Sequence, residues 1–142
     1  MDREDTAGSG VCKAVADLLF EVGMLRKTPR TGYQFLGSGQ ESVAEHSFRT
    51  TVIGYVLAKL ADVDWTKVVL MCLFHDVHEA RTGDFNYVNR MYNTSLDTRA
   101  LSDALAGTGL DQDVLAVQEE LETASSLEAV LAQDADQLDL IL

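Results

Sequence analysis

The stretch that decides the fold reads VVLMCLFHDVHE and occupies residues 68–79. Its first part, residues 68–74, is apolar all round, which predicts the central buried helix of an all-α domain. The apolar run ends in two polar side chains, His75 and Asp76. A buried imidazole and a buried carboxylate are costly without a partner, and a metal ion is a partner that satisfies both. This dyad is therefore the first candidate for a functional site.

Helical signals continue on both sides of this stretch. Ser42 and Glu45 form a capping box that begins a helix ending near residue 61, and Asp64 is the N-cap expected for a helix over residues 65–80. Further helices are expected over residues 11–23, 95–106, 111–124 and 126–142, with residues 86–94 helical or turn-like. No segment alternates strongly enough to predict a strand. We predict an all-α fold, a single helical bundle of about six helices without significant sheet.

The chain is expected to form one domain, because it has no internal repeat and no low-complexity linker. Residues 1–10 are acidic and polar, which predicts a flexible N-terminal tail and leaves residues 11–142 as the folded domain. Residues 24–41 are punctuated by proline and glycine and are expected to be a loop. The last helix has no C-cap glycine and no basic last turn, so we expect its C-terminal end to be truncated.

Acidic residues dominate the charge: 23 Asp and Glu against 11 Lys and Arg give a net charge of −12. No basic stripe could neutralise the phosphates of a nucleic acid polymer, so such polymers are excluded as partners. A small phosphorylated substrate stays open, because a metal ion and one or two local arginines can hold it. No apolar run approaches the ~20 residues of a membrane span, and the N-terminus is unlike a signal peptide. We expect a cytoplasmic protein with no membrane partner.

The remaining histidines and acids supply candidates for further ligands. His46 lies in the first turn of the helix that follows Ser42, where it could meet the dyad. Glu79 lies four residues after His75 and therefore on the same helical face, with Asp76 beside them. A further ligand should come from the acidic last helix. Periodicity alone leaves its candidates open: Asp134, Asp136 and Asp139.

Five short motifs follow one another along the chain. They are PRTG at 29–32, ESVAEHS at 41–47, FHDVHE at 74–79, TGD at 82–84 and DADQLD at 134–139. Their order and local context resemble the HD-domain metal-dependent phosphohydrolases, in particular the branch of small HD proteins with 5′-deoxynucleotidase activity. The resemblance runs from about Leu25 to the C-terminus. It implies that the predicted bundle is an HD domain.

The resemblance also implies a role for each matching residue. One divalent metal ion (Mn²⁺, Co²⁺, Fe²⁺, Zn²⁺ or Mg²⁺) would be bound by four side chains: His46, His75, Asp76 and Asp136. The resemblance, and not periodicity, selects Asp136 over Asp134. Glu79 and Asp84 would flank the attacking water and the leaving oxygen, and Arg30 would hold the substrate phosphate.

The leading functional prediction is a metal-dependent phosphohydrolase that converts (deoxy)ribonucleoside 5′-monophosphates, small-molecule nucleotides, to nucleoside and phosphate. Two alternatives stay open. The same site could serve a phosphodiesterase or a nucleotide triphosphohydrolase, or the chain could be a non-catalytic module for metal binding or dimerisation. Only His78 is left over as a histidine, which argues against centres with several metal ions. The apolar end of the last helix, together with the resemblance, predicts a homodimer.

Overall fold

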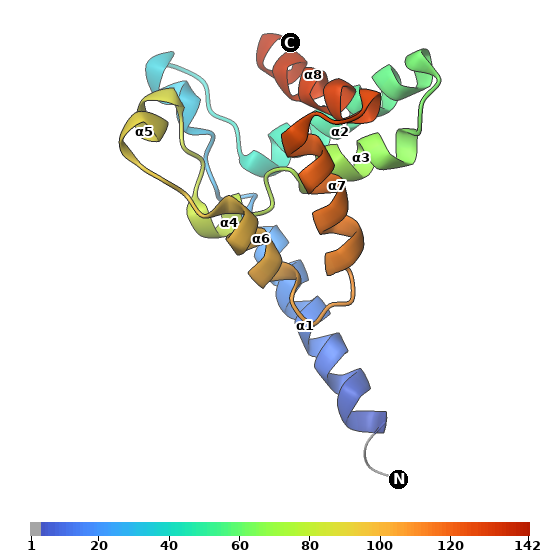
Figure 1. The fold of residues 1–142 in the computed structure, drawn as a ribbon. Coiled ribbons are helices and arrows are strands. Elements are labelled where there is room, and N and C mark those ends of the chain that lie inside the picture. Colours follow the sequence, from blue (N-terminus) through green and yellow to red (C-terminus); the bar gives the residue numbers. More distant parts are fainter. Residues whose placement is uncertain (1–3) are drawn as a thin grey trace.

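Three helices pack against one another and form the centre of the molecule. The computed structural model describes residues 4–142, with side chains described from Gly8 onward. The central helices are α2 (Val43–Ala61), α3 (Trp65–Phe74) and α8 (Leu127–Ile141), and each contacts the other two. They lie together at one end of the molecule, while α1 (Glu4–Met24) projects from the other end (Figure 1).

The central helices begin where their capping residues predict. Ser42 accepts a hydrogen bond from the Glu45 backbone N–H, and the Glu45 carboxylate accepts one in return from the Ser42 backbone, which completes the capping box. Asp64 accepts hydrogen bonds from the backbone N–H groups of the first turn of α3. Between the helices the core is built largely from small side chains, which lets the backbones approach closely: Ala58, Cys72, Ala129, Ala132 and Ala135.

Gly54 lies where α2 packs tightly against α3. A Cβ atom placed on Gly54 would lie 2.6 Å from Sγ of Cys72 and 3.2 Å from Cγ1 of Val68. Neither contact leaves room for a side chain, because buried atoms are already close-packed. Glycine at this position therefore lets α2, which carries His46, pack closely against α3, which ends directly before His75.

A second core joins the C-terminal half of α1 to three further helices. These are α4 (Glu79–Thr82), α6 (Asp97–Leu105) and α7 (Asp111–Thr123). The buried apolar side chains of this core include Leu18, Val77, Leu101, Leu105 and Val114. A short helix, α5 (Tyr87–Tyr92), and the 3-10 helix η1 (Thr31–Phe35) lie to one side, held together by Asn86, which donates to the backbone carbonyl of Thr31 at 3.4 Å.

The all-α prediction is confirmed: residues 4–142 contain eight α-helices, one 3-10 helix and no strand. The prediction of one helix over residues 65–80 is wrong, because α3 ends at Phe74 and a turn separates it from α4. The turn is tightened by bonds from Val77 N–H to Phe74 and from Glu79 N–H to Asp76. The break has a packing reason. Met71 is buried in the central core, whereas Val77 is buried in the second core, and one straight helix does not serve both.

The N-terminal helix is longer than the sequence predicts. We expected a tail over residues 1–10, but α1 already begins at Glu4, and residues 1–3 lie outside the described part of the chain. Gly8, Ser9 and Gly10 are exposed, so they carry no burial pattern from which a helix could be predicted. Within the described residues, no helix combines the length and the apolar character needed to cross a membrane.

Candidate metal centre

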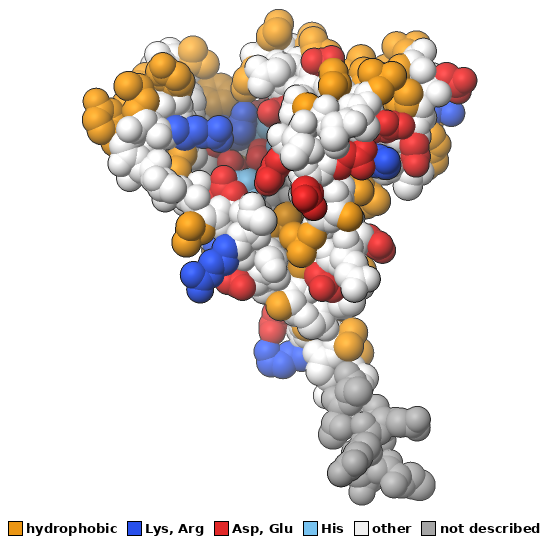
Figure 2. Space-filling model, viewed as in Figure 1, with side chains coloured by type: hydrophobic (Ala, Val, Ile, Leu, Met, Phe, Trp, Pro, Cys, Tyr) orange, Lys and Arg blue, Asp and Glu red, His pale blue; other side chains and the backbone are white. Residues whose placement is uncertain are grey.

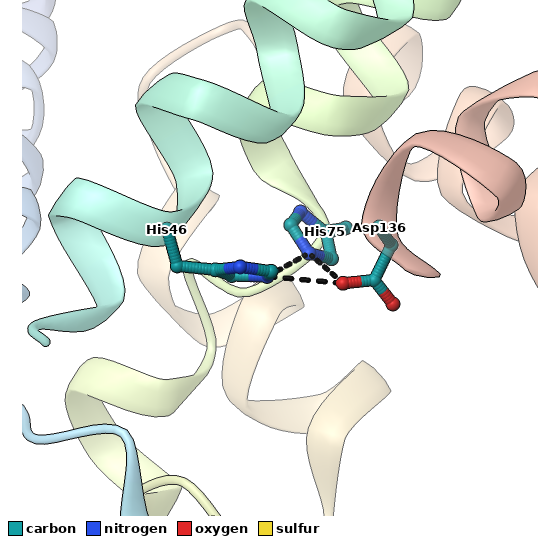
Figure 3. Close-up of side chains that lie close together, drawn as sticks. All are labelled: His46, His75 and Asp136. Carbon is teal, nitrogen blue, oxygen red and sulfur yellow. Dashed lines mark hydrogen bonds and ion pairs between the residues drawn. The ribbon is translucent and has the colours of Figure 1, made fainter. Parts of the chain in front are cut away.

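The four predicted ligands lie together, although they come from three separate parts of the chain. His46 projects from α2, His75 and Asp76 from the turn after α3, and Asp136 from α8. Nε2 of His46 is 3.2 Å from Nε2 of His75, 3.4 Å from Oδ2 of Asp76 and 3.0 Å from Oδ1 of Asp136. Figure 3 shows the two imidazoles and Asp136 pointing toward one another.

The spacing of these atoms suits a single ion. Ligand atoms about 2.1 Å from one ion, at tetrahedral or octahedral angles, lie about 3.0–3.4 Å from one another. Besides the three distances from His46, Nε2 of His75 is 3.1 Å from Oδ2 of Asp76 and 3.6 Å from Oδ1 of Asp136. His46, His75 and Asp136 each offer a ligand atom within 4.8 Å of the other two, and Asp76 lies within 3.4 Å of both imidazoles, so two imidazoles and two carboxylates supply a donor set whose chemistry suits one divalent cation.

The outer hydrogen bonds of the two histidines turn the same ring atom of each toward this centre. Nδ1 of His75 is 2.7 Å from the backbone oxygen of Cys72, which can only accept, so Nδ1 carries the proton. Nδ1 of His46 is 2.5 Å from Oδ2 of Asp139 and donates in the same way. Both Nε2 atoms are thereby free to face the carboxylates of Asp76 and Asp136. Four acceptor atoms facing one another require a cation between them, either protons or a metal ion.

The pKa values of these side chains are shifted because two histidines and two carboxylates lie close together. Burial alone lowers the pKa of His46, but the carboxylates of Asp136 and Asp76 outweigh burial and raise it to about 9. Burial likewise opposes protonation of His75, and the same two carboxylates raise its pKa to about 10. In return, the histidines hold the pKa values of Asp76 and Asp136 below the usual range, although burial acts in the opposite direction.

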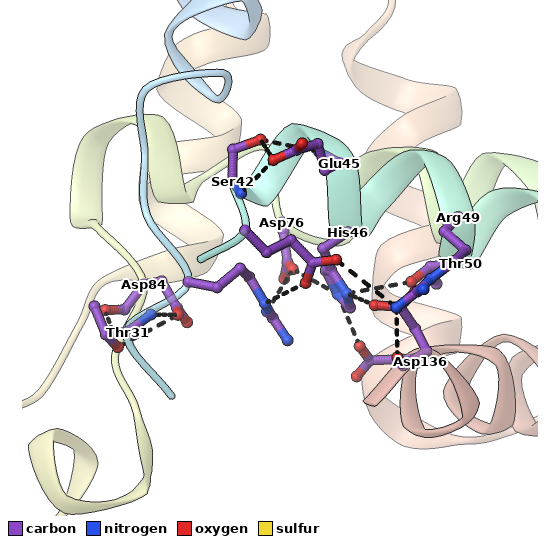
Figure 4. Close-up of polar contacts among 12 residues, drawn as sticks. Thr31, Ser42, Glu45, His46, Arg49, Thr50, Asp76, Asp84 and Asp136 are labelled. Atoms are coloured by element: carbon purple, nitrogen blue, oxygen red, sulfur yellow. Dashed lines mark hydrogen bonds and ion pairs between the residues drawn. The ribbon is translucent and has the colours of Figure 1, made fainter. Parts of the chain in front are cut away.

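The acids that periodicity left open on the last helix separate into three positions. Asp136 reaches the centre, and Asp134 is exposed. Asp139 is buried behind His46, where it accepts from Nδ1 of His46 and from Nε of Arg49. Figure 4 shows Arg49 and His46 projecting from α2. Sequence reasoning missed Arg49, although its spacing of three residues after His46 places it on the same side of α2.

A cleft of about 590 Å³ opens onto the centre. Asp76 and Asp136 line it together with the other predicted site residues, Arg30, Glu79 and Asp84. Its lining also includes aromatic and apolar side chains from η1, from the α5 region and from the end of α8: Tyr33, Phe35, Leu36, Phe85, Tyr87, Leu140 and Leu142. The cleft therefore combines charged groups near the centre with a substantial apolar lining.

Glu79 is buried in this cleft, and among the described residues its Oε2 atom has no hydrogen-bond partner. Burial raises the pKa of Glu79 to about 9, and the neighbouring carboxylates of Asp76 and Asp84 act in the same direction. The carboxyl group of Glu79 is therefore protonated at neutral pH. Asp84 accepts hydrogen bonds from the backbone N–H of Thr31 at 2.7 Å and from its hydroxyl, which fixes the loop that carries Arg30 (Figure 4).

A smaller cavity of about 370 Å³ meets the centre from another direction and is lined by His75, His78 and Asp97, among others. Nε2 of His78 is 3.5 Å from Oδ1 of Asp97. His78 thus faces this second cavity and pairs with Asp97, and one of its ring nitrogens also lies within 4.8 Å of carboxylate oxygens of Asp76 and Glu79.

In this helical bundle, two histidines and two aspartates from three parts of the chain converge, as in proteins that hold a metal ion between helices. The chain belongs to the HD domain family, whose model matches residues 22–142. A solved structure of a conserved hypothetical protein from Pyrococcus furiosus is similar to it, with a TM-score of 0.74, 31% identity, and coverage of 89% of this chain and 74% of that one.

Curated relatives include proteins named 5′-deoxynucleotidase HDDC2. The protein from Danio rerio is 28% identical over 127 residues, which cover 85% of this chain and 63% of the relative. The protein from Bos taurus is 31% identical over 127 residues, which cover 85% of this chain and 62% of the relative. The chain therefore spans less than two thirds of the length of these two relatives.

Proposed function

We propose that the chain is a metal-dependent phosphohydrolase that cleaves (deoxy)ribonucleoside 5′-monophosphates into nucleoside and phosphate. The observation that carries this proposal is the convergence of His46, His75, Asp76 and Asp136 beside a cleft with an aromatic lining. Membership of the HD domain family and the 5′-deoxynucleotidase relatives support the same activity.

The four converging side chains would hold one divalent ion, with Mn²⁺, Co²⁺, Fe²⁺, Zn²⁺ and Mg²⁺ as the candidates. Such an ion lowers the pKa of a coordinated water and neutralises phosphoryl oxygens. The protein orients its own ligands through the outer hydrogen bonds, from His46 to Asp139 and from His75 to the Cys72 carbonyl. These bonds fix the ring orientations before a substrate enters.

The other cleft residues would act on the phosphate ester. Glu79, protonated at neutral pH, would donate its proton to the departing 5′-oxygen. Arg30 would offer its guanidinium fork to phosphate oxygens. Asp84 would hold the Arg30 loop through Thr31 and flank the leaving oxygen. Tyr33, Phe35 and Tyr87 would provide flat apolar surfaces for the nucleoside.

Release of inorganic phosphate from a panel of 5′-monophosphates tests this proposal. Purified protein supplied with Mn²⁺ or Co²⁺ is expected to hydrolyse at least one of dAMP, dGMP, dCMP, dTMP and dUMP. The same panel should include a phosphodiester and a nucleoside triphosphate, because preference for either would assign the site to one of the alternative reactions. Metal binding without any turnover would instead favour the non-catalytic module.

Metal affinity is expected to rise with pH between pH 6 and pH 8. In protein without metal, the pKa values of about 9 and 10 mean that His46 and His75 are protonated throughout this range, so a metal ion must displace their protons. Each displaced proton strengthens apparent affinity by about tenfold per pH unit. Isothermal titration calorimetry in buffers of different ionisation enthalpy would count the protons released, and an affinity independent of pH would contradict this expectation.

We also propose that the protein acts as a homodimer. Exposed apolar side chains lie on α2 and at the end of α8, including Phe48, Leu60, Leu140 and Ile141. The accessible surface of the chain is 9158 Å², against about 7,200 Å² expected for a folded monomer of this mass. Sedimentation velocity at several concentrations is expected to show a dimer, and a monomer at all concentrations would contradict it.

We also propose a cytoplasmic location. The two free cysteines of the chain, Cys12 and Cys72, suit a reducing compartment.

A further inference from the structure

Three arginines line the cleft, and two of them already have carboxylate partners. Nη1 of Arg30 is 3.7 Å from Oδ2 of Asp76, and its Nε is 4.0 Å from Oε2 of Glu41. Arg49 pairs with Asp139 and lies 3.8 Å from Glu41. The positive charges of Arg30 and Arg49 are thus largely balanced by the protein's own acids.

Arg90, on α5, is different. Its Nε donates to the backbone oxygen of Phe85 at 2.8 Å, which anchors the side chain without neutralising it. Across the part of the chain that the structure describes, no carboxylate lies within ion-pair distance of Arg90. Its terminal nitrogens are therefore available for a ligand, and a guanidinium presents a planar fork that matches phosphate oxygens.

The position of Arg90 connects it to the candidate metal centre. The cleft of about 590 Å³ and the smaller cavity share three lining residues: Asp76, Arg90 and Asp136. Arg90 thus lines both cavities, as do two of the candidate metal ligands. Figure 2 shows Lys or Arg side chains extending across the hollow, with acidic and histidine side chains beneath them.

The charge of the cleft makes such a group necessary for binding an anion. Six acidic side chains line the cleft against three arginines: Glu41, Asp76, Glu79, Asp84, Asp136 and Asp139. Glu79 is protonated at neutral pH, and the other five carboxylates repel a phosphate dianion unless cations that are not paired with the protein's own acids face it. A bound divalent ion would be one such cation. Arg90 is the arginine of the cleft that supplies a second positive charge.

We propose that Arg90 is a phosphate-binding residue that acts together with Arg30 on the same phosphate. The inference rests on the proposed phosphohydrolase function and extends it by a residue that no sequence motif singled out. Arg30 would approach the phosphate from the loop before η1, and Arg90 would approach it from α5. The phosphate would then lie between the two guanidinium groups and the candidate metal centre.

The test measures binding of inorganic phosphate to Mn²⁺-loaded protein by isothermal titration calorimetry. Arg90→Met keeps the apolar stem but removes the guanidinium group, and it is expected to weaken phosphate binding about ten- to a hundredfold, the usual size of a lost charged hydrogen bond. Arg90→Lys keeps the charge and should restore part of the affinity. The matched control is Arg99→Met on α6, an exposed arginine that pairs with Asp103 and lines neither cavity.

Wild-type phosphate affinity in Arg99→Met, together with a loss of at least threefold in Arg90→Met, would support the proposal. A smaller loss in Arg90→Met, or no phosphate binding by the wild-type protein, would overturn it. Metal content and circular dichroism of each variant would show that the centre and the fold are retained. Turnover of 5′-monophosphates is measured separately. Turnover that Arg90→Met leaves unchanged would overturn the role of Arg90 and preserve the proposed function, whereas phosphate binding without any wild-type turnover would overturn only the function.

Discussion

Replacing His75 by alanine is expected to abolish tight metal binding and to lower phosphohydrolase turnover by at least about a thousandfold. Nε2 of His75 lies 3.1 Å from Asp76 and 3.6 Å from Asp136, so the substitution removes one of four converging donor atoms. It also leaves two carboxylates without one of the two histidines that stabilise their charge. Metal content after equilibration with Mn²⁺, followed by single-turnover phosphate release, would measure both effects.

The matched control is His78→Ala, three residues further along the same turn. His78 lies within 4.8 Å of Asp76 and Glu79, but it pairs with Asp97 and is not part of the group formed by His46, His75 and Asp136, so its loss should leave metal content unchanged and turnover within about threefold of wild type. Retention of metal by His75→Ala would show that the proposed ligand set is wrong. Equal loss of metal in both variants would show that His78 belongs to that set.

Substitution of Gly54 by leucine is expected to destabilise the protein by at least about 3 kcal/mol, a large part of the stability of a typical domain. Even a Cβ atom at this position lies 2.6 Å from the buried Cys72 sulfur, and the remaining leucine atoms have no space between α2 and α3. The two helices would have to separate, which also moves His46 relative to His75. Urea denaturation followed by circular dichroism would measure the free energy of unfolding.

Gly10→Leu provides the control, because Gly10 is a helical glycine with no atom within 4 Å of an added Cβ. There the substitution should be neutral or should stabilise by up to about 1 kcal/mol through helix propensity. A double-mutant cycle isolates the contact itself. Gly54→Ala should be less damaging when combined with Cys72→Ala, since the smaller side chain removes the obstructing sulfur. Equal effects of leucine at positions 10 and 54 would contradict close packing as the cause.

Much of the fold could be predicted because its helices carry local signals. The capping box at Ser42, the N-cap at Asp64 and the fully apolar run at residues 68–74 each act within a few residues. The end of α3 at Phe74 could not be predicted in this way. It depends on Val77 packing into a different core from Met71, and that is a property of the tertiary structure. The length of α1 was missed because Gly8, Ser9 and Gly10 are exposed and carry no burial pattern.

The residues of the candidate centre likewise include some that the sequence predicts and some that only the tertiary structure reveals. His75 and Asp76 stand out in the sequence because they follow an apolar run, and motif order placed His46 and Asp136 with them. Asp139 could not be separated from Asp136 by periodicity, because both belong to one amphipathic helix and only the contact with His46 distinguishes them. Arg90 carried no signal, since an arginine on a short exposed helix is ordinary until the cavity beside it is known.

The break after Phe74 has a further consequence for how this protein can change. The candidate metal ligands lie on the packed helices α2 and α8 and at the end of α3, whereas η1, α4 and the α5 region supply the opposite side of the cleft. Residues on that side, such as Phe35 and Tyr87, are exposed and contribute little to either core. Under the proposed function, natural substitutions on that side of the cleft would change which molecules bind and leave the candidate metal ligands in place, because the two sets of residues are supported by different parts of the fold.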